Sequence, residues 1–223
     1  MSREVSPEKV RRFYDRFGKL QDAQRFYEES ATTELIKHAN FKDARDIFEL
    51  GCGTGLFARK LFQDYLTPDT RYAGIDISPN MVKLTRERLK PWSNRASVEL
   101  VNTDVPGLSA LDNSMDRFVS NYVFDLLPFK TTEKYLAEAH RVLRPDGLLC
   151  VTSLTFGNTT LSRFISNTWL RIWKLKPILL GGCRPIALSD YLTPENWKIV
   201  YLGKKIEFGI TSEVLVAIPL GKS

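Results

Sequence analysis

The stretch that decides the fold is residues 46–55, DIFELGCGTG, where a short apolar run leads into three closely spaced glycines. Residues 47–50 have the length and composition of a buried strand. Gly51, Gly53 and Gly55 let the backbone turn sharply and approach a ligand without the clash of a Cβ atom. Apolar residues at helical spacing follow at once. A strand, a glycine turn and a helix in this order predict the opening unit of an α/β fold.

The chain continues this alternation of strands and helices after the glycine turn. Apolar strands without polar alternation indicate a parallel sheet that is buried on both faces. Ser78 and Pro79 mark one helix start, because serine caps a helix and proline suits its first turn. We expect strands at 47–50, 71–77, 97–101, 117–122 and 148–153, helices at 56–65, 79–89 and 131–143, and a turn at 144–147.

The two ends of the chain depart from this rhythm. Helical patterns precede the first strand, one starting at Ser6 and Pro7 and one at 25–39, and another helix is expected at 158–174. Residues 198–208 and 212–219 read as two strands that turn at Gly209 and pair as a hairpin.

Together these elements predict an α/β, Rossmann-like, mostly parallel seven-stranded sheet with an antiparallel C-terminal strand and helices on both faces. We expect one domain over residues 1–223. Its parts are an N-terminal helical cap (1–40), a core (41–155), a helical insert or lid (156–196) and a C-terminal hairpin (197–223).

The composition is that of a soluble globular protein, with 43% hydrophobic and 26% charged residues among 223. The net charge of +6 is modest for a nucleic-acid binder. Three cysteines lie far apart, and no cluster of histidines and carboxylates suggests a metal site. The N-terminus lacks the apolar core of a signal peptide, and no apolar run reaches the roughly 18 residues of a membrane span. These features predict a cytoplasmic protein.

Acidic residues follow the second and third predicted strands. Asp76 lies about twenty residues after the last glycine, where a carboxylate can accept hydrogen bonds from both ribose hydroxyls. Asp104 could accept from an adenine amino group, and the alternative is a solvated turn aspartate. A nicotinamide fingerprint would need glycine at position 56, which is Leu56. The pattern favours a different adenosine-containing cofactor.

Residues 46–155 resemble the class I S-adenosylmethionine-dependent methyltransferases. The resemblance lies in ELGCGTG at 49–55, GIDISPNM at 74–81, Asp104, RVLRPDGLL at 141–149, and a closing hairpin that ends in VLVAI at 214–218. It implies methyl transfer from S-adenosylmethionine, bound by the core.

The resemblance also implies a set of cofactor-binding residues. Glu49 should face the methionine portion, and Asn121 should lie beneath the methyl-bearing sulfur. Ile77 and Met81 should sandwich the adenine, although helix-to-sheet packing equally explains Met81. The full expected set is Tyr14, Glu49, Gly51, Cys52, Gly53, Gly55, Asp76, Ile77, Met81, Thr103, Asp104, Val105 and Asn121.

Methyl transfer is an in-line displacement, so the protein mainly positions the reactants and excludes water. A general base is needed only if the acceptor keeps its proton at neutral pH. Tyr122 and Asp125, near the end of the fourth strand, are the candidates for a catalytic base, and both are also candidates for packing or turn roles.

Substrate choice should depend on the added pieces. By analogy with small-molecule methyltransferases of the ubiquinone and menaquinone type, we expect Tyr27 to border the acceptor pocket and Tyr14 to close over the cofactor. Simple core packing is the alternative for both. The insert at 161–185 holds five basic and no acidic residues, and it carries Trp169 as a candidate substrate contact. Such a segment suits a lid, a peripheral membrane contact, or an ordinary amphipathic helix.

The layout is similar to small-molecule methyltransferases of the ubiquinone and menaquinone biosynthesis type. We therefore expect methylation of a small, hydrophobic or aromatic acceptor. One alternative is an RNA methyltransferase on the same scaffold, although residues 121–124, NYVF, lack an Asn/Asp-Pro-Pro-aromatic signature. The other is a protein that binds S-adenosylmethionine without transferring its methyl group.

Overall fold

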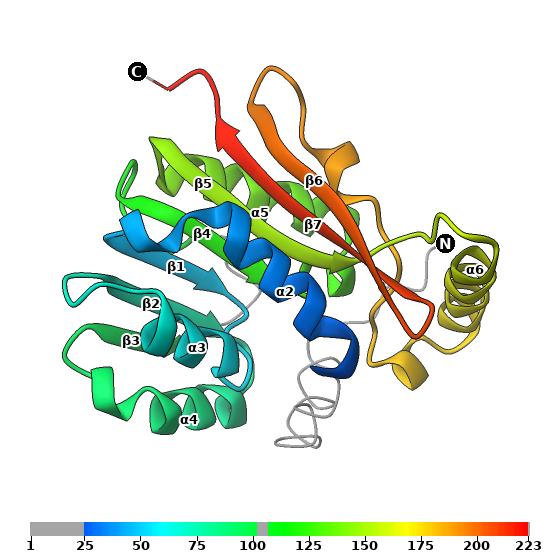
Figure 1. Cartoon of the computed structure of the whole chain (residues 1–223), viewed down its shortest axis with the longest axis horizontal. Helices are drawn as coiled ribbons and strands as arrows, with labels where there is room; N and C mark the ends of the chain where they lie inside the picture. Colours follow the sequence, from blue (N-terminus) through cyan, green and yellow to red (C-terminus); the bar gives the residue numbers. More distant parts are fainter. Residues whose placement is uncertain (1–24, 102–106, 223) are drawn as a thin grey trace.

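The computed structural model describes residues 25–101 and 107–222. Its centre is one seven-stranded sheet, which Figure 1 shows as a twisted layer with helices around it. From one edge to the other the strands are β3 (Ala96–Leu100), β2 (Arg71–Asp76), β1 (Asp46–Leu50), β4 (Met115–Asn121), β5 (Leu143–Leu154), β7 (Ile210–Pro219) and β6 (Trp197–Glu207).

Strands β1 to β5 form a parallel block, and β7 runs antiparallel to both of its neighbours, β5 and β6. All five residues of β1 are buried, as expected for the middle strand of a covered sheet. The predicted Rossmann-like, mostly parallel seven-stranded fold with an antiparallel C-terminal strand is confirmed.

Helices cover both faces of the sheet (Figure 1). One apolar cluster joins one face to α2 (Arg25–Ala39), α3 (Leu56–Asp64) and α4 (Pro79–Arg88). A second cluster joins the other face to α5 (Phe129–Val142). Helix α6 (Thr160–Leu175) lies beyond the hairpin end of the sheet. Short 3-10 helices are η2 (Phe41–Asp43), η3 (Lys90–Trp92), η4 (Phe124–Leu126), η5 (Pro177–Leu180) and η6 (Leu188–Tyr191).

Within the described ranges, no helix combines the length and the apolar character that a membrane crossing requires.

Most predicted elements occur where the patterns place them. Helix α4 begins at Pro79 with Ser78 as its cap, whose hydroxyl accepts from the Met81 amide at 3.2 Å. The prediction of a turn at 144–147 is wrong, because β5 already begins at Leu143 and includes these residues. A register irregularity against β4 accommodates them. The helix predicted from Ser6 lies outside the described residues.

Asp116 joins the amino ends of β1, β4 and β5. Its Oδ2 accepts from the amides of Arg45 at 2.7 Å and Asp46 at 2.8 Å, and the Arg144 guanidinium contacts the carboxylates of Asp46 and Asp116. Burial raises the pKa of Asp116, but these donors outweigh it and hold the pKa below its usual range. Arg144 therefore helps to hold the sheet together, because its guanidinium pairs with carboxylates on both β1 and β4.

Replacing Asp116 with alanine should lower the free energy of unfolding by about 2 kcal/mol, because two amides and a guanidinium lose their acceptor. Urea denaturation measures the change. Asp112→Ala is the matched control, since its exposed carboxylate pairs with Arg141 at the surface and should contribute less than about 0.5 kcal/mol. The effect of Asp116→Ala should shrink as the pH falls below about 4, because a carboxyl with a lowered pKa stabilises the fold only when ionised. An equal effect of both variants would contradict this role.

Candidate functional site

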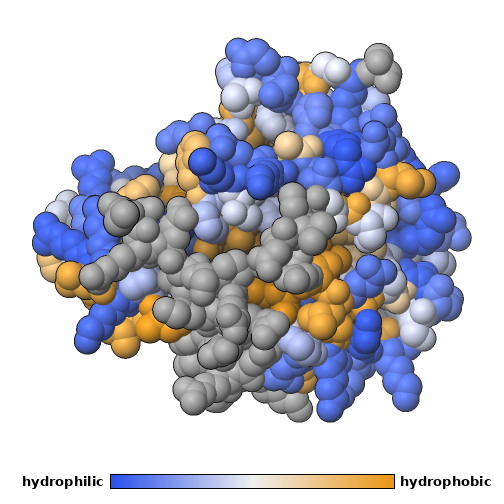
Figure 2. Space-filling model, turned by 180° about the vertical axis from the view of Figure 1, so that it is seen from behind, coloured by the Kyte–Doolittle hydropathy of each residue, from blue (hydrophilic) through white to orange (hydrophobic). Residues whose placement is uncertain are grey.

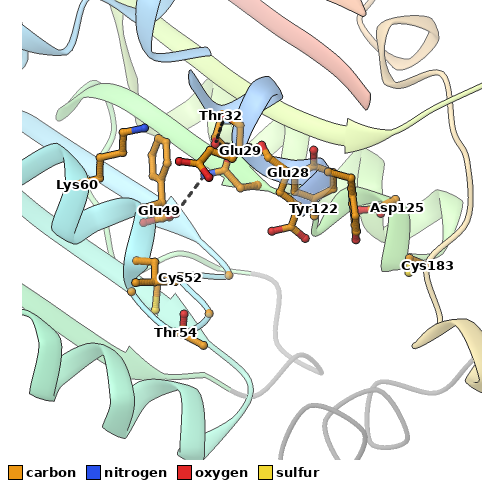
Figure 3. Close-up of a pocket in the computed structure, with 17 residues that line it drawn as sticks. Glu28, Glu29, Thr32, Glu49, Cys52, Thr54, Lys60, Tyr122, Asp125 and Cys183 are labelled. Carbon is orange, nitrogen blue, oxygen red and sulfur yellow. Dashed lines mark hydrogen bonds between the residues drawn. The ribbon is translucent and has the colours of Figure 1, made fainter. Parts of the chain in front are cut away.

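A cavity of about 150 Å³ opens where β1 and β4 end, between the glycine turn and α2 (Figure 3). Its walls come from segments far apart in the sequence, which the parallel sheet brings to one edge. The described residues that line it are Tyr27, Glu28, Glu29, Thr32, Glu49, Gly51, Cys52, Gly53, Thr54, Gly55, Leu56, Phe57, Lys60, Asn121, Tyr122, Asp125 and Cys183.

The three positions of the turn require glycine for different structural reasons. All have positive φ, at +72°, +53° and +77° for Gly51, Gly53 and Gly55. A Cβ on Gly51 would come within 2.3 Å of Val123, and one on Gly55 within 2.9 Å of the Thr85 backbone. A Cβ on Gly53 would meet no atom of the described residues within 4 Å. Gly51 and Gly55 therefore permit close packing, whereas at Gly53 no described atom fills the place of a side chain.

The turn is held by hydrogen bonds from β2 and α4. The Gly53 amide donates to Asp76 Oδ2 at 2.9 Å, and the Thr85 hydroxyl donates to the Gly53 carbonyl at 2.7 Å. Arg88 donates to the Thr54 carbonyl at 2.6 Å. Sequence reasoning missed Thr85 and Arg88, although their spacing of three on one helix was a signal that both face the same neighbour.

Glu49 is a buried carboxyl at the end of β1, with 2% of its surface exposed. The Tyr72 hydroxyl donates to Oε2 at 2.5 Å, and the Asn121 amide donates to Oε1 at 3.4 Å. Burial raises the pKa of Glu49 to about 7, against the opposing effect of these two donors. A cation brought into the cavity would therefore favour loss of the Glu49 proton.

Gly74 and Thr152, which the sequence reasoning missed, allow Tyr72 and Asn121 to point toward Glu49. A Cβ on Gly74 would approach the Tyr72 hydroxyl to 2.7 Å, so the glycine leaves room for that ring to pass over β2 and reach Glu49 on the neighbouring strand β1. The Thr152 hydroxyl donates to Asn121 Oδ1 at 2.9 Å, which fixes the amide with its NH₂ toward Glu49. Both contacts join adjacent strands at positions that a pattern read along one strand does not connect.

The other end of the cavity holds Tyr27, Tyr122, Asp125 and Cys183. Asp125 is 1% exposed, and neither of its carboxylate oxygens has a hydrogen-bond partner within the described part of the chain. Burial raises its pKa to about 7. The rings of Tyr27 and Tyr122 meet edge to face with centroids 5.7 Å apart, and the Tyr122 hydroxyl bonds to Ser212 at 2.7 Å. This end combines aromatic surface with one unsatisfied carboxyl group.

Figure 3 shows the two ends of the same cavity. Glu49, Cys52 and Thr54 lie on one side, and Tyr122, Asp125 and Cys183 lie on the other, with Glu28 and Glu29 of α2 between them. The sequence reasoning missed Glu28, Glu29, Thr32 and Lys60 as lining residues, since no motif along the chain signals that α2 lies over the turn.

The remaining predicted site residues lie elsewhere. Asp76 supports the turn from outside the lining, and its Oδ1 also accepts from the Ser78 amide at 2.9 Å. Ile77 and the buried Met81 follow it and are not in the lining. The Trp169 indole donates to the Cys183 carbonyl at 3.0 Å and so supports the wall from behind. Tyr14, Thr103, Asp104 and Val105 lie outside the described residues.

Comparisons with known proteins show what the chain is similar to. Residues 47–147 match the family described as Methyltransferase domain. A malonyl-[acyl-carrier protein] O-methyltransferase of Acetivibrio thermocellus is 30% identical over 150 residues, 67% of this chain and 47% of that protein. A demethylmenaquinone methyltransferase of Desulfitobacterium hafniense is 30% identical over 146 residues, 66% and 56% respectively. The chain thus spans about half the length of these curated relatives.

Among solved structures, the partner of the Haloferax volcanii Trm112 methyltransferase activator superposes with a TM-score of 0.71 at 14% identity. The match covers 96% of this chain and 99% of that one, and it shows that the fold is shared. The chain therefore contains a class I S-adenosylmethionine-dependent methyltransferase domain, and S-adenosylmethionine is the cofactor of that class.

The glycines of the turn should respond differently to alanine. Gly55→Ala should lower the free energy of unfolding by about 3 kcal/mol, because the added methyl meets the Thr85 backbone at positive φ. Gly53→Ala should cost only about 1–2 kcal/mol, the strain of the left-handed conformation alone. Urea denaturation of both variants provides the comparison, and a larger loss for Gly53→Ala would contradict the assignment.

Proposed function

We propose that the chain transfers the methyl group of S-adenosylmethionine to a small, uncharged, hydrophobic or aromatic acceptor that carries an O–H or N–H group. One observation carries this proposal: a single cavity joins a glycine turn and buried Glu49 at one end to aromatic rings and unsatisfied Asp125 at the other. Such an arrangement can hold a cationic methyl donor beside an acceptor.

The residues at the first end fit the cofactor. No described atom lies within 4 Å of a Cβ built on Gly53, so a ligand can approach the turn closely there, and the Glu49 carboxyl can ionise against the ammonium group. Asp76, at the end of β2, accepts from the Gly53 and Ser78 amides, and we assign its carboxylate as the acceptor for the ribose hydroxyls. The bound cofactor supplies a methyl carbon already activated by its sulfonium.

At the second end, Asp125 fits the role of general base. Asp125 would take the proton that the acceptor oxygen or nitrogen loses when bound S-adenosylmethionine supplies its methyl group. Alignment of the two reactants supplies on the order of 7–11 kcal/mol, and a positioned base adds roughly 10²–10⁴-fold. A pKa of about 7 suits a base that works near neutral pH.

The charges around the cavity restrict the acceptor. Four residues of its described lining carry carboxyl groups, namely Glu28, Glu29, Glu49 and Asp125, and one, Lys60, carries an amine. This balance opposes an anionic acceptor such as a free carboxylate. The edge-to-face rings of Tyr27 and Tyr122 favour a flat apolar one.

Replacing Asp125 with asparagine tests the base. Formation of S-adenosylhomocysteine with a panel of phenolic, quinol and amine acceptors should fall by about 10²–10³-fold in kcat. The parent rate should rise with pH and level off above about 7, where Asp125 is ionised, and the variant should lose this step.

Asp112→Asn serves as the matched control, since its carboxylate is exposed and Asp112 is not a lining residue. An unchanged rate for Asp125→Asn would exclude Asp125 as the base. Cofactor binding without turnover on any acceptor, including carboxylates and RNA, would contradict the proposed methyl transfer.

Cofactor affinity should depend on the ionisation of Glu49. Its carboxyl is protonated below about pH 7 in the free protein, so binding an ammonium group must release that proton. The affinity for S-adenosylhomocysteine should therefore fall by up to about tenfold per pH unit below 7 and stay level above it. Glu49→Gln should flatten this profile.

Calorimetry in buffers of different ionisation heats measures both the affinity and the released proton. Glu99→Gln is the control, because its side chain is exposed on β3 and is not part of the lining. A parent affinity that does not change between pH 6 and 7 would place the ammonium group away from Glu49.

A further inference from the structure

Helix α6 presents an apolar stripe to solvent. Leu161, Phe164, Ile172 and Leu175 are 64%, 68%, 38% and 72% exposed. With Thr168 between them, their spacings of three and four place them along one face of the helix. An ordinary surface helix turns such a stripe toward the core, so this one is available to a partner.

A different face of α6 attaches the helix to the protein. Ser162 and Ser166 are buried, and the indoles of Trp169 and Trp173 donate to the carbonyls of Cys183 and Gly182 at 3.0 and 2.7 Å. These contacts hold the helix to the segment that lines the cavity. The exposed stripe is therefore not the face that packs against the rest of the molecule.

Neighbouring segments extend the apolar surface. Leu179 of η5 is 67% exposed, and Phe208 at the turn of the β6–β7 hairpin is 76% exposed. The hairpin turn lies against α6, since a Cβ on Gly209 would come within 2.2 Å of Ile165. We call these six side chains the α6 patch: Leu161, Phe164, Ile172, Leu175, Leu179 and Phe208. Figure 2 shows hydrophobic surface mixed with hydrophilic side chains at this end of the molecule.

Along α6 and the segment after it the charged side chains are all basic, whereas Glu207 lies beside Phe208 at the hairpin turn. Arg163, Arg171, Lys174 and Lys176 are exposed on or beside α6. No acidic residue occurs between positions 157 and 189. Basic side chains can keep their charges at the headgroups while their stems and the apolar stripe enter the boundary of the acyl chains.

We propose that the α6 patch docks the protein on an anionic lipid surface. A second copy of the chain would bring like charges together at the same place, which opposes self-association through this face. An anionic bilayer satisfies both the apolar stripe and the cations. Because Trp169 and Trp173 connect α6 to the wall of the cavity, docking holds that wall near the membrane.

Flotation of the full chain with lipid vesicles tests the proposal. The protein should float with vesicles of phosphatidylcholine and phosphatidylglycerol in equal parts and stay behind with phosphatidylcholine alone. Phe164→Ser should weaken partition about tenfold, the loss of one inserted aromatic side chain. Arg171→Glu combined with Lys174→Glu should weaken it about a hundredfold, and added salt should weaken binding of the parent.

Matched controls use exposed residues elsewhere. Leu111→Ser changes a side chain that is 78% exposed between β3 and β4, and Lys90→Glu changes an exposed charge on η3, so neither should alter flotation. Affinity for S-adenosylhomocysteine verifies that every variant is folded. Equal flotation with both vesicle types, or none with either, would overturn the proposal. A dimer detected by light scattering that Phe164→Ser dissolves, without vesicle binding, would assign the patch to a second copy.

Discussion

The hydrogen bond from the Gly53 amide to the Asp76 carboxylate is the interaction on which the site depends. It joins the turn after β1 to the end of β2 at 2.9 Å, while Thr85 and Arg88 of α4 hold the carbonyls of the same turn. These contacts fix a backbone of three positive φ angles that would otherwise have much conformational freedom. With the turn fixed, the cavity has a rigid floor before any ligand arrives.

The cavity contains two buried carboxyl groups, Glu49 and Asp125, which have similar pKa values but different neighbours. Glu49 accepts from Tyr72 and Asn121, and a cation beside it would favour release of its proton to solvent. The carboxylate oxygens of Asp125 accept no hydrogen bond from a described side chain or backbone group at bonding geometry, and burial outweighs the nearby Arg184 charge in raising its pKa. One chain can thus favour positive charge at one end of a cavity and accept a proton at the other, because burial and not charge pairing sets both values.

The sequence predicted those features that depend on residues near one another in the chain. The strand, glycine turn and helix at 46–64, the serine cap at Ser78 and the hairpin are local patterns, and they determine the sheet and one wall of the cavity. It did not predict the contact of Tyr72 with Glu49 or of Thr152 with Asn121, because strand register decides which side chains meet. The turn expected at 144–147 failed for a similar reason, since Arg144 contacts carboxylates on two other strands.

The position of β7 has a consequence for biosynthesis. Residues 210–219 come after every other strand in the described chain, yet they lie inside the sheet between β5 and β6. While these residues are still being translated, β6 has no partner and β5 exposes a long apolar edge. The hairpin half of the sheet must therefore assemble after synthesis of this segment.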